Sequence, residues 1–347
     1  MRILLTGNQG YIGTILVPRL WVMGYDVVGL DSGLFRECTL RTIRDVPTIR
    51  KDIRNVEAGD LDGIDAVIHL AGLSNDPLGN LSAPLTYAIN YEATVRLAEL
   101  AKRAGIRRFL YASSCSVYGA AGDEFLDEDS RFNPVTPYAD SKARSEHDLR
   151  RLADQAFCPV YLRAATAYGA SPLLRFDLSV NNLVAWAATT GRVFLKSLGT
   201  SWRPVVHIED IAQAYVALLR APEAKVHNRA FNIGQTRENY RISDVAELVR
   251  HIVPDTRIEF AADATEDLRN YRVNCDLIQR TLPHYCPHWT VEQGIREVYD
   301  AIQFGGLSTD DFEGPRYSRI AYLKRLIADG RVDENLRWVE LLGAAAA

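Results

Sequence analysis

Tyr138 and Lys142 combine residue types and a spacing that indicate proton-transfer chemistry. They begin and end the run Tyr-Ala-Asp-Ser-Lys, and positions four apart share one face of a helix. A free phenol has a pKa of about 10 and is a poor base at neutral pH. An ammonium group a few ångströms away favours the phenolate, which can take a proton from a hydroxyl group. The competing interpretation is a solvated tyrosine and lysine on a helix surface.

A glycine-rich segment near the N-terminus has the spacing of a diphosphate-binding turn. Residues 4–13 read Leu-Leu-Thr-Gly-Asn-Gln-Gly-Tyr-Ile-Gly. Between a strand and a helix, Gly7 makes the tight turn, Gly10 lets the backbone approach a diphosphate, and Gly13 lets the helix pack on the sheet. The helix then offers free N–H groups and the positive end of its dipole. Without flanking strands, three glycines indicate only a surface turn.

Asp31 predicts which dinucleotide this turn binds. It follows Gly7 by 24 residues and ends the next apolar run, Val-Val-Gly-Leu-Asp. A carboxylate at the tip of that strand can accept hydrogen bonds from both ribose hydroxyls, whereas it would repel a 2′-phosphate. The sequence therefore predicts NAD rather than NADP as the cofactor.

The elements that must position these residues alternate between strand and helix. Near-continuous apolar strands separated by helical periodicity indicate a parallel sheet that is covered by helices on both faces. The expected strands are at 2–6, 26–31, 65–70, 107–112 and 159–163, and the expected helices are at 12–23, 84–104 and 137–155, the last starting at Pro137. The fold class is therefore α/β, with a Rossmann-type doubly wound parallel sheet.

The second half of the chain has a mixed pattern, which predicts a smaller α/β substrate lobe towards the C-terminus. The expected elements are helices at Asp177–Thr190, Glu209–Arg220, Asp244–Val253 with Ser243 as N-cap, Val291–Gln303 and Arg316–Ala328, and strands at Val193–Lys196 and Phe231–Ile233. We expect an NAD-binding domain at 1–170 with 207–233, a substrate lobe at 171–206 and 234–305, and a helical extension of unassigned role at 306–347. The terminal Gly343–Ala347 is expected to carry no function.

The composition excludes several classes of partner. The 347 residues carry a net charge of −4 without a basic block, so nucleic acid is not expected as a partner. No apolar run approaches the roughly 20 residues that span a bilayer, and the chain starts on a strand without a secretory leader. Its five cysteines are scattered and form no CxxC pair. We therefore expect a cytoplasmic protein without disulfides, a metal site or a membrane partner.

Taken together, these motifs resemble the extended short-chain dehydrogenase/reductase family, and within it the nucleotide-sugar epimerases and dehydratases. The resemblance covers roughly residues 1–300 in order. Its segments are Thr6–Gly13, Asp31, Asp52-Ile53, His69-Leu-Ala-Gly72, Asn90, Ser113–Gly119, Tyr138–Lys142, Arg163–Gly169 and Arg203–Asp210.

This resemblance implies roles for particular residues. Ser114 would hydrogen-bond the reacting sugar oxygen, Tyr138 would transfer the proton, and Lys142 would hold the nicotinamide ribose. Asp52 and Ile53 would contact the adenine. The implied cofactor-binding set is Gly7, Gly10, Tyr11, Ile12, Gly13, Asp31, Asp52, Ile53, Leu70, Ala71, Gly72, Tyr138 and Lys142.

The resemblance also implies a site for a nucleotide-diphosphate sugar. Arg203 is the candidate for its diphosphate, since a guanidinium fork suits phosphate oxygens, and Arg269 or Arg272 would supply a second contact. Further candidates for the substrate pocket are Ser116, Thr166 and Asn182. Asn90 would either brace the strand edge or meet substrate. His207 is expected to be a packed strand-end residue rather than a catalyst.

Two departures from the family pattern bear on the reaction. Dehydratases of the family carry an Asp-Glu pair after the active hydroxyl, and decarboxylases carry a glutamate, where this chain has Cys115 and Ser116. Neither is a good acid–base group, which argues against 4,6-dehydration and decarboxylation. Ala164, Ala165 and Thr166 replace the usual Tyr-Phe-Asn, so the substrate pocket is expected to differ from that of a hexose 4-epimerase.

The leading hypothesis is an NAD-dependent epimerase that acts at C4 of a nucleotide-sugar through a transient 4-keto sugar. The alternative is a ketoreductase for a nucleotide-linked 4-keto-deoxysugar in antibiotic or surface-glycan synthesis, which would use the same three residues. A remote alternative is a non-catalytic NAD-sensing or RNA-binding protein, although such chains usually lose the tyrosine or the lysine. By analogy with the family, we expect a homodimer through the helices at 84–104 and 137–155.

Overall fold

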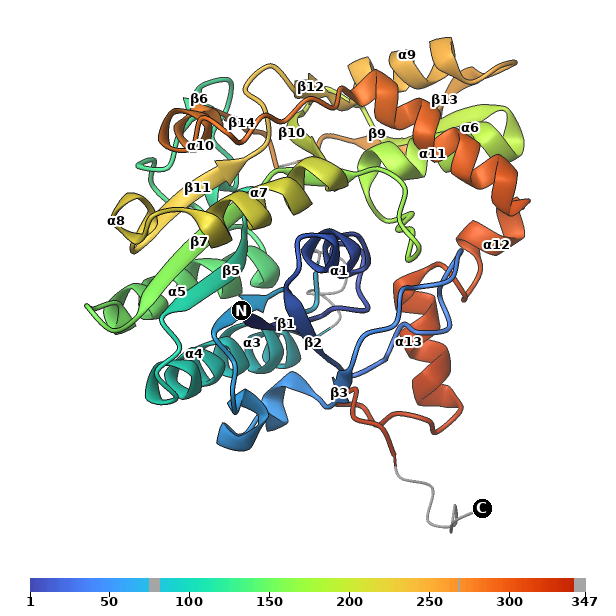
Figure 1. Ribbon diagram of the computed structural model, residues 1–347. Helices are drawn as coiled ribbons and strands as arrows, with labels where there is room; N and C mark the ends of the chain where they lie inside the picture. The colour runs from blue at the N-terminus through green and yellow to red at the C-terminus, as the bar shows by residue number, and fades with distance from the viewer. Residues whose placement is uncertain (75–81, 268, 340–347) are drawn as a thin grey trace.

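A seven-stranded parallel sheet forms the centre of the protein (Figure 1). The computed structural model describes residues 1–74, 82–267 and 269–339, so the predicted terminal segment 343–347 lies outside it. The strands occur in the order β11-β7-β5-β4-β1-β2-β3 and every neighbouring pair is parallel. Their bounds are β1 Arg2–Thr6, β2 Asp26–Asp31, β3 Thr48–Arg50, β4 Ala66–His69, β5 Arg108–Ser114, β7 Cys158–Ala164 and β11 Arg229–Ile233.

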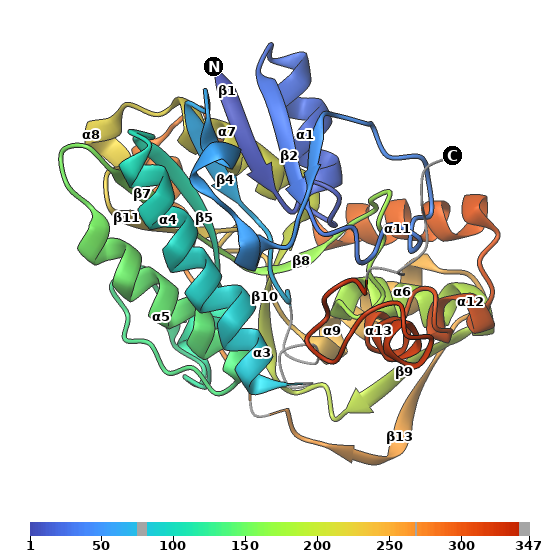
Figure 2. The same cartoon turned by 90° about the horizontal axis from the view of Figure 1, so that it is seen from below.

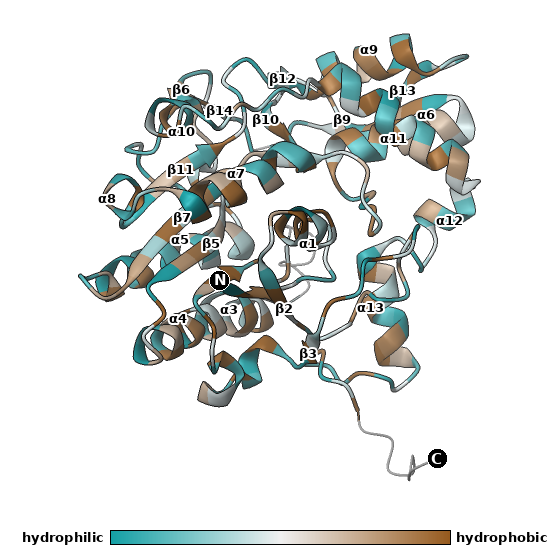
Figure 3. Cartoon of the chain, in the orientation of Figure 1, coloured by the Kyte–Doolittle hydropathy of each residue, from teal (hydrophilic) through white to brown (hydrophobic). Residues whose placement is uncertain are grey.

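Alternating side chains of the central strands feed two separate cores. On β1, Leu4 belongs to one apolar cluster, whereas Ile3 and Leu5 belong to the other, and all three are fully buried. This alternation follows from the period of two along a strand. A strand buried on both faces must be apolar throughout, which is why the sequence pattern predicted a parallel sheet. Figure 3 shows the resulting concentration of hydrophobic residues on β1, β2 and α1 (Gly13–Val22).

Helices cover both faces of this sheet, as predicted. One core contains side chains of α3, α4 and α5, and the other contains side chains of α1, α7, α8 and α10. Their bounds are α3 Ala83–Tyr87, α4 Ala93–Arg103, α5 Pro137–Leu152, α7 Ile208–Arg220, α8 Glu223–Val226 and α10 Asp276–Thr281. Four short turns of other helical type lie at η1 Ile53–Asn55, η2 Ala58–Leu61, η3 Ala88–Glu92 and η4 Cys115–Tyr118.

A smaller set of strands and helices lies beyond the carboxyl ends of the central strands. Most of these elements share a third apolar cluster, which Tyr11 of the glycine-rich loop also joins, whereas β6 and β14 contribute to a fourth cluster with Cys115, Val117 and Tyr118. β10 pairs with β8 and β12, β13 with β9, and β14 with β6. The bounds are β6 Phe125–Leu126, β8 Thr166–Tyr168, β9 Arg192–Ser197, β10 Trp202–His207, β12 Asn239–Arg241, β13 Arg257–Thr265, β14 Arg272–Val273, α6 Ser179–Thr190, α9 Ile242–Ile252 and α11 Val291–Gly305.

Several predicted elements differ in detail from the structure. The helix expected at 84–104 contains the π-helical turn η3 between α3 and α4. There the Asn90 carbonyl accepts hydrogen bonds from the side chains of Thr94 and Ser145. Ser243 is not the N-cap of α9. Because β12 pairs with β10 as far as Arg241, the chain stays extended to that residue and the helix begins directly after it.

The last described residues return to the first strands of the sheet (Figure 2). α13 follows α12 (Thr309–Glu313) and extends from Arg319 to Ala328. Its start lies three residues after the predicted start, and its end is as predicted. Tyr322, Leu323 and Leu326 of α13 are buried in the same cluster as Leu4 and Leu30. The C-terminal segment, defined here as Arg316–Val339, is therefore part of the core of the nucleotide-binding half.

No helix within the described residues combines the length and the apolar content needed to cross a membrane.

Candidate active site

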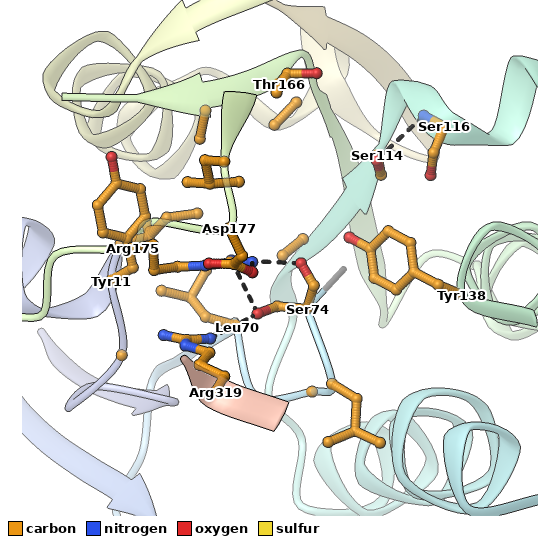
Figure 4. Close-up of a pocket in the computed structure, with 18 of the residues that line it drawn as sticks. Tyr11, Leu70, Ser74, Ser114, Ser116, Tyr138, Thr166, Arg175, Asp177 and Arg319 are labelled. Carbon is orange, nitrogen blue, oxygen red and sulfur yellow. Dashed lines mark hydrogen bonds and ion pairs between the residues drawn. The ribbon is translucent and has the colours of Figure 1, made fainter. Parts of the chain in front are cut away.

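A cavity of about 820 Å³ opens at the carboxyl ends of the central strands. It begins at the glycine-rich loop between β1 and α1, passes the ends of β2, β4 and β5, and reaches the strands of the smaller lobe. The loop lies where β1 has β2 on one side and β4 on the other. This reversal of strand order is where ligands bind in open α/β sheets. Figure 4 shows side chains from both halves of the chain around this cavity.

The three glycines of the loop have the geometry that their predicted roles require. Gly7 has a φ of +73°, and a Cβ on it would lie 2.9 Å from the Ala71 nitrogen. A Cβ on Gly13 would collide with the Gly7 carbonyl. The Gly10 amide donates to that carbonyl at 3.0 Å. Side chains at Gly7 and Gly13 would therefore collide with the backbone and displace the loop, so glycine is required for the compact turn that can approach a diphosphate.

Asp31 lies at the tip of β2, as predicted, and lines the cavity. Its carboxylate accepts hydrogen bonds from the amides of Gln9 (3.2 Å) and Gly33 (2.8 Å). Burial raises the pKa of Asp31, and these two bonds oppose the rise. Asp52 and Ile53 line the same end of the cavity. The structure thus brings together the residues that the resemblance assigned to adenosine.

Asn90 braces a turn and does not line the cavity within the described residues. Its amide nitrogen donates to the Leu73 carbonyl at 3.0 Å, and its oxygen accepts the Leu73 amide at 2.7 Å. Leu70, Ala71 and Gly72 precede this bonded residue and line the cavity. Of the two roles considered for Asn90, the structure supports the bracing role.

Tyr138 and Lys142 lie on α5 and both line the cavity. Thr136 caps the helix by accepting the Ala139 amide, and Pro137 occupies its first turn, as predicted. The Lys142 ammonium lies 5.8 Å from the centre of the Tyr138 ring and donates to the Ala112 carbonyl at 2.7 Å. Burial lowers the pKa of Lys142 to about 8, and Glu146 opposes this shift. The pair is a partly desolvated site, not a solvated helix face.

Ser114 and Ser116 approach the cavity from the end of β5 (Figure 4). The Ser114 hydroxyl accepts the Ser116 amide at 3.1 Å and caps η4. The Ser116 hydroxyl is buried and has no hydrogen-bond partner among the described residues. An unsatisfied buried hydroxyl is costly, so this group fits a site that is completed by a ligand.

The predicted substrate residues divide into those that line the cavity and one that does not. Thr166, Asn182, Arg203 and Arg269 line it, and Arg203 and Arg269 both pair with Asp267, at 2.6 and 2.7 Å. Arg272 instead stacks on Phe125 and Trp202 and, within the described residues, does not line the cavity. The prediction of Arg272 as a substrate contact therefore has no support in this geometry.

His207 is a packed residue, as expected. Its ring stacks on Trp289 with centres 3.7 Å apart, and Nε2 lies 2.8 Å from a Glu297 carboxylate oxygen. Its Nδ1 accepts the Glu209 amide and caps α7.

Among the cavity residues that were not predicted, four form one polar cluster. Arg175 pairs with Asp177 at 2.6 Å, and both Arg175 and Arg319 donate to the Ser74 hydroxyl, at 3.0 and 3.1 Å. All four line the cavity. No short motif connects them, because they come from three distant parts of the chain. The only sequence signal was the unassigned basic helix around Arg319.

The sheet order, the glycine loop with Asp31, and the Tyr138–Lys142 pair define an NAD-binding enzyme of the extended short-chain dehydrogenase/reductase type. The comparison of sequences identifies the particular family. Residues 3–234 match the NAD dependent epimerase/dehydratase family, and this chain belongs to it. The predictions of family, fold class and NAD are thereby confirmed.

Several relatives have described activities. The chain is 30% identical over 263 residues to a UDP-glucose 4-epimerase of Bacillus subtilis, covering 67% of this chain and 77% of that protein. It is 32% identical over 248 residues to a UDP-glucose 4-epimerase of Mycolicibacterium smegmatis, with the same coverages. Among solved structures, UDP-glucuronic acid 4-epimerase from Bacillus cereus, in complex with UDP-glucuronic acid and NAD, matches with a TM-score of 0.74. That structure is 25% identical and is covered over 99% of its chain, against 88% of this one.

Proposed function

We propose that this protein is an NAD-dependent nucleotide-sugar epimerase that inverts C4 of a nucleotide-linked hexose. The observation that carries the proposal is that Tyr138 lines the same cavity as the glycine-rich loop and the two arginines Arg203 and Arg269. Relatives named as UDP-glucose 4-epimerases support the same reaction.

NAD, when bound, supplies the hydride acceptor and donor for the sugar carbon. The chain's own residues handle the proton and the orientation. In this proposal Tyr138 takes the proton of the sugar hydroxyl, and the buried Lys142 ammonium favours the negative charge that the phenol needs for this. Ser114 holds the reacting oxygen. Arg203 and Arg269 hold the substrate diphosphate, because guanidinium forks match phosphate oxygens.

The geometry around η4 argues against water elimination. Cys115 is buried, and its thiol donates to the Arg163 carbonyl at 3.1 Å. Burial raises the pKa of this thiol, so it stays neutral at physiological pH. Ser116 supplies a hydroxyl and no carboxylate. The site therefore lacks, at these two positions, the acid and base that dehydration would require.

The decisive experiment incubates the purified protein with a panel of nucleotide-linked hexoses, without added cofactor, and follows the sugar signals by NMR. An epimerised sugar is the expected product, because an epimerase regenerates its NAD in each cycle. Conversion only with a 4-keto sugar and added reduced cofactor would replace this proposal with the ketoreductase. A clear preference for NADPH in a binding titration would point the same way.

We also propose a cytoplasmic homodimer that associates through the helical regions 84–104 (α3, η3 and α4) and 137–155 (α5). The first region is bonded to α5, because Tyr87 of α3 donates to Asp140 (2.7 Å) and Tyr91 of η3 donates to Asp148 (2.5 Å). A rigid helix pair is a suitable dimer surface. Light scattering at micromolar concentration is expected to give twice the chain mass of 38.8 kDa, and a monomer would refute the dimer.

A further inference from the structure

The C-terminal segment forms part of the wall of the NAD cavity. Arg319, at the start of α13, and Leu336 both line it. Trp338 donates to the Ser32 carbonyl at 2.7 Å, directly after Asp31. Residues that are more than 280 positions from the glycine loop therefore close the cavity beside the adenosine end.

The side chains of Arg175, Asp177 and Arg319 lie close together near Ser74, inside this cavity (Figure 4). Arg175 is buried and makes a bidentate ion pair with Asp177, at 3.0 and 2.6 Å. Arg319 approaches from α13 and shares the Ser74 hydroxyl with Arg175. The Arg175–Asp177 pair is balanced, so Arg319 adds one positive charge at this point.

The charge of Arg319 is poorly compensated in the protein alone. Burial, followed by the nearby Arg175 guanidinium, lowers the pKa of Arg319 to about 9. The side chain remains charged at neutral pH. The carboxylates of Asp177 and Asp31 oppose this shift only in part. A half-buried cation beside a second cation therefore favours an anionic ligand.

The position of these arginines indicates which part of the cofactor supplies that charge. Asp31 marks the adenosine end of the cavity, and Tyr138 marks the end where the sugar reacts. Arg319 lies over the ring of Phe35, four residues after Asp31, with its guanidinium carbon 4.6 Å from the ring centre. The Asn181 amide that donates to the Arg175 carbonyl also donates to the Tyr11 hydroxyl of the glycine-rich loop. Both arginines donate to Ser74, two residues after Gly72, so the pair lies between these two parts of the cavity. In a dinucleotide, the group between the two riboses is the diphosphate.

We propose that Arg319 binds the NAD diphosphate opposite the glycine-rich loop, and that the C-terminal segment thereby retains the cofactor. The inference rests on NAD binding and not on the identity of the sugar. A guanidinium contributes charge-assisted hydrogen bonds to phosphate that a neutral side chain cannot replace. Retention suits an enzyme that must keep one NAD through many cycles.

The test measures binding of NAD, ADP and adenosine to cofactor-stripped protein by calorimetry. Arg319→Gln is expected to weaken the binding of NAD and ADP by about 10- to 100-fold, the range for one charge-assisted hydrogen bond. The affinity for adenosine is expected to stay unchanged. Lys324→Gln, which removes the same charge from an exposed position of α13, is the matched control and is expected to change each affinity less than about 2-fold. Purified Arg319→Gln protein should also carry less NAD, measured by releasing the nucleotide on denaturation.

Two results would overturn the proposal. Unchanged ADP affinity would show that Arg319 does not contact the diphosphate. Equal losses for ADP and adenosine would show that it only shapes the wall. If Arg319→Gln does not fold, Arg319→Lys is measured with the same ligands: it keeps the charge but loses the fork, so a few-fold loss for ADP alone supports the contact, and no selective loss contradicts it.

Discussion

The Tyr138 hydroxyl and the Lys142 ammonium have separable roles, which single substitutions can distinguish. Tyr138→Phe removes the proton-transferring oxygen and is expected to reduce turnover by about 10²- to 10⁴-fold, the usual contribution of a positioned acid or base. NAD affinity should stay within a few-fold of wild type. Tyr111→Phe is the matched control, because the Tyr111 ring lies 4.8 Å from the same ammonium but the residue is fully buried. Near-normal turnover in Tyr138→Phe would contradict the assignment.

Lys142 places a charge where the protein alone does not favour it. Its pKa is about 8 in the folded protein and 10.5 ordinarily, so the unfolded state binds the proton more tightly. The charged Lys142 side chain therefore lowers the free energy of unfolding by about 3 kcal/mol below pH 8. This reduction disappears as the pH rises towards 10.5. Lys142→Met should therefore lose turnover, yet exceed wild type in apo-protein stability at pH 7. This advantage should shrink by pH 10, as measured by urea unfolding; an advantage independent of pH would contradict the explanation.

The residues that could be predicted are those whose signal is local in the sequence. Gly7, Gly10 and Gly13 lie in one turn, and Tyr138 and Lys142 lie on one helix turn, so spacing alone indicated shared sites. Arg175 and Arg319 come together only because α13 folds back onto the first strands. No spacing rule connects positions 144 residues apart, and this part of the site required the structure.

At the scale of elements, His69 joins β4 to its neighbours by two buried hydrogen bonds. Its ring nitrogens lie 2.7 Å from the Thr6 hydroxyl on β1 and 2.8 Å from the Thr94 hydroxyl on α4. Burial lowers the pKa of His69 to about 3, with Lys142 adding to the shift. The ring is neutral in the folded protein, whereas the unfolded chain takes up a proton below about pH 6.5.

The stability supplied at His69 is therefore complete above pH 6.5 and is lost as the pH falls towards 3. The loss is about 1.4 kcal/mol per pH unit, or about 2 kcal/mol between pH 6.5 and 5. His69→Gln should reduce the difference between urea unfolding at pH 7 and pH 5 by that amount. His284→Gln, at an exposed side chain, is the control for the loss of an imidazole. The same pH dependence in all three proteins would refute this role.

Elements with a strong periodicity of apolar residues were predicted well. Elements that depend on pairing with strands far away in the sequence were not. The five strands predicted in the central sheet and the helices of α1, α5 and α7 follow directly from buried apolar patterns. β3, β10 and β13 were missed, because these strands are identified by the strands with which they pair. The start of α9 was misplaced for the same reason: the pairing of Arg241 with Trp202 ends the strand at that residue, and the helix begins directly after it, two residues before the expected start.

At the scale of the whole molecule, α13 links the end of the chain to its beginning. Leu326 is fully buried in the cluster that contains Leu4 and Leu30. Leu326→Ala should cost about 2–5 kcal/mol of unfolding free energy, the usual range for a leucine in a packed core. Lys324→Ala, on an exposed part of the same helix, should cost less than about 0.5 kcal/mol. A loss below about 1 kcal/mol in Leu326→Ala would show that the segment is only loosely attached.

The docking of α13 on the first strands also has a consequence for protein synthesis. The ribosome makes β1 and β2 first, and domains generally begin to fold from the N-terminus while translation continues. Here the apolar face that carries Leu4 and Leu30 is covered by Tyr322, Leu323 and Leu326, which are made about 300 residues later. The core of the nucleotide-binding half therefore stays incomplete until α13 has been made and has left the ribosomal exit tunnel.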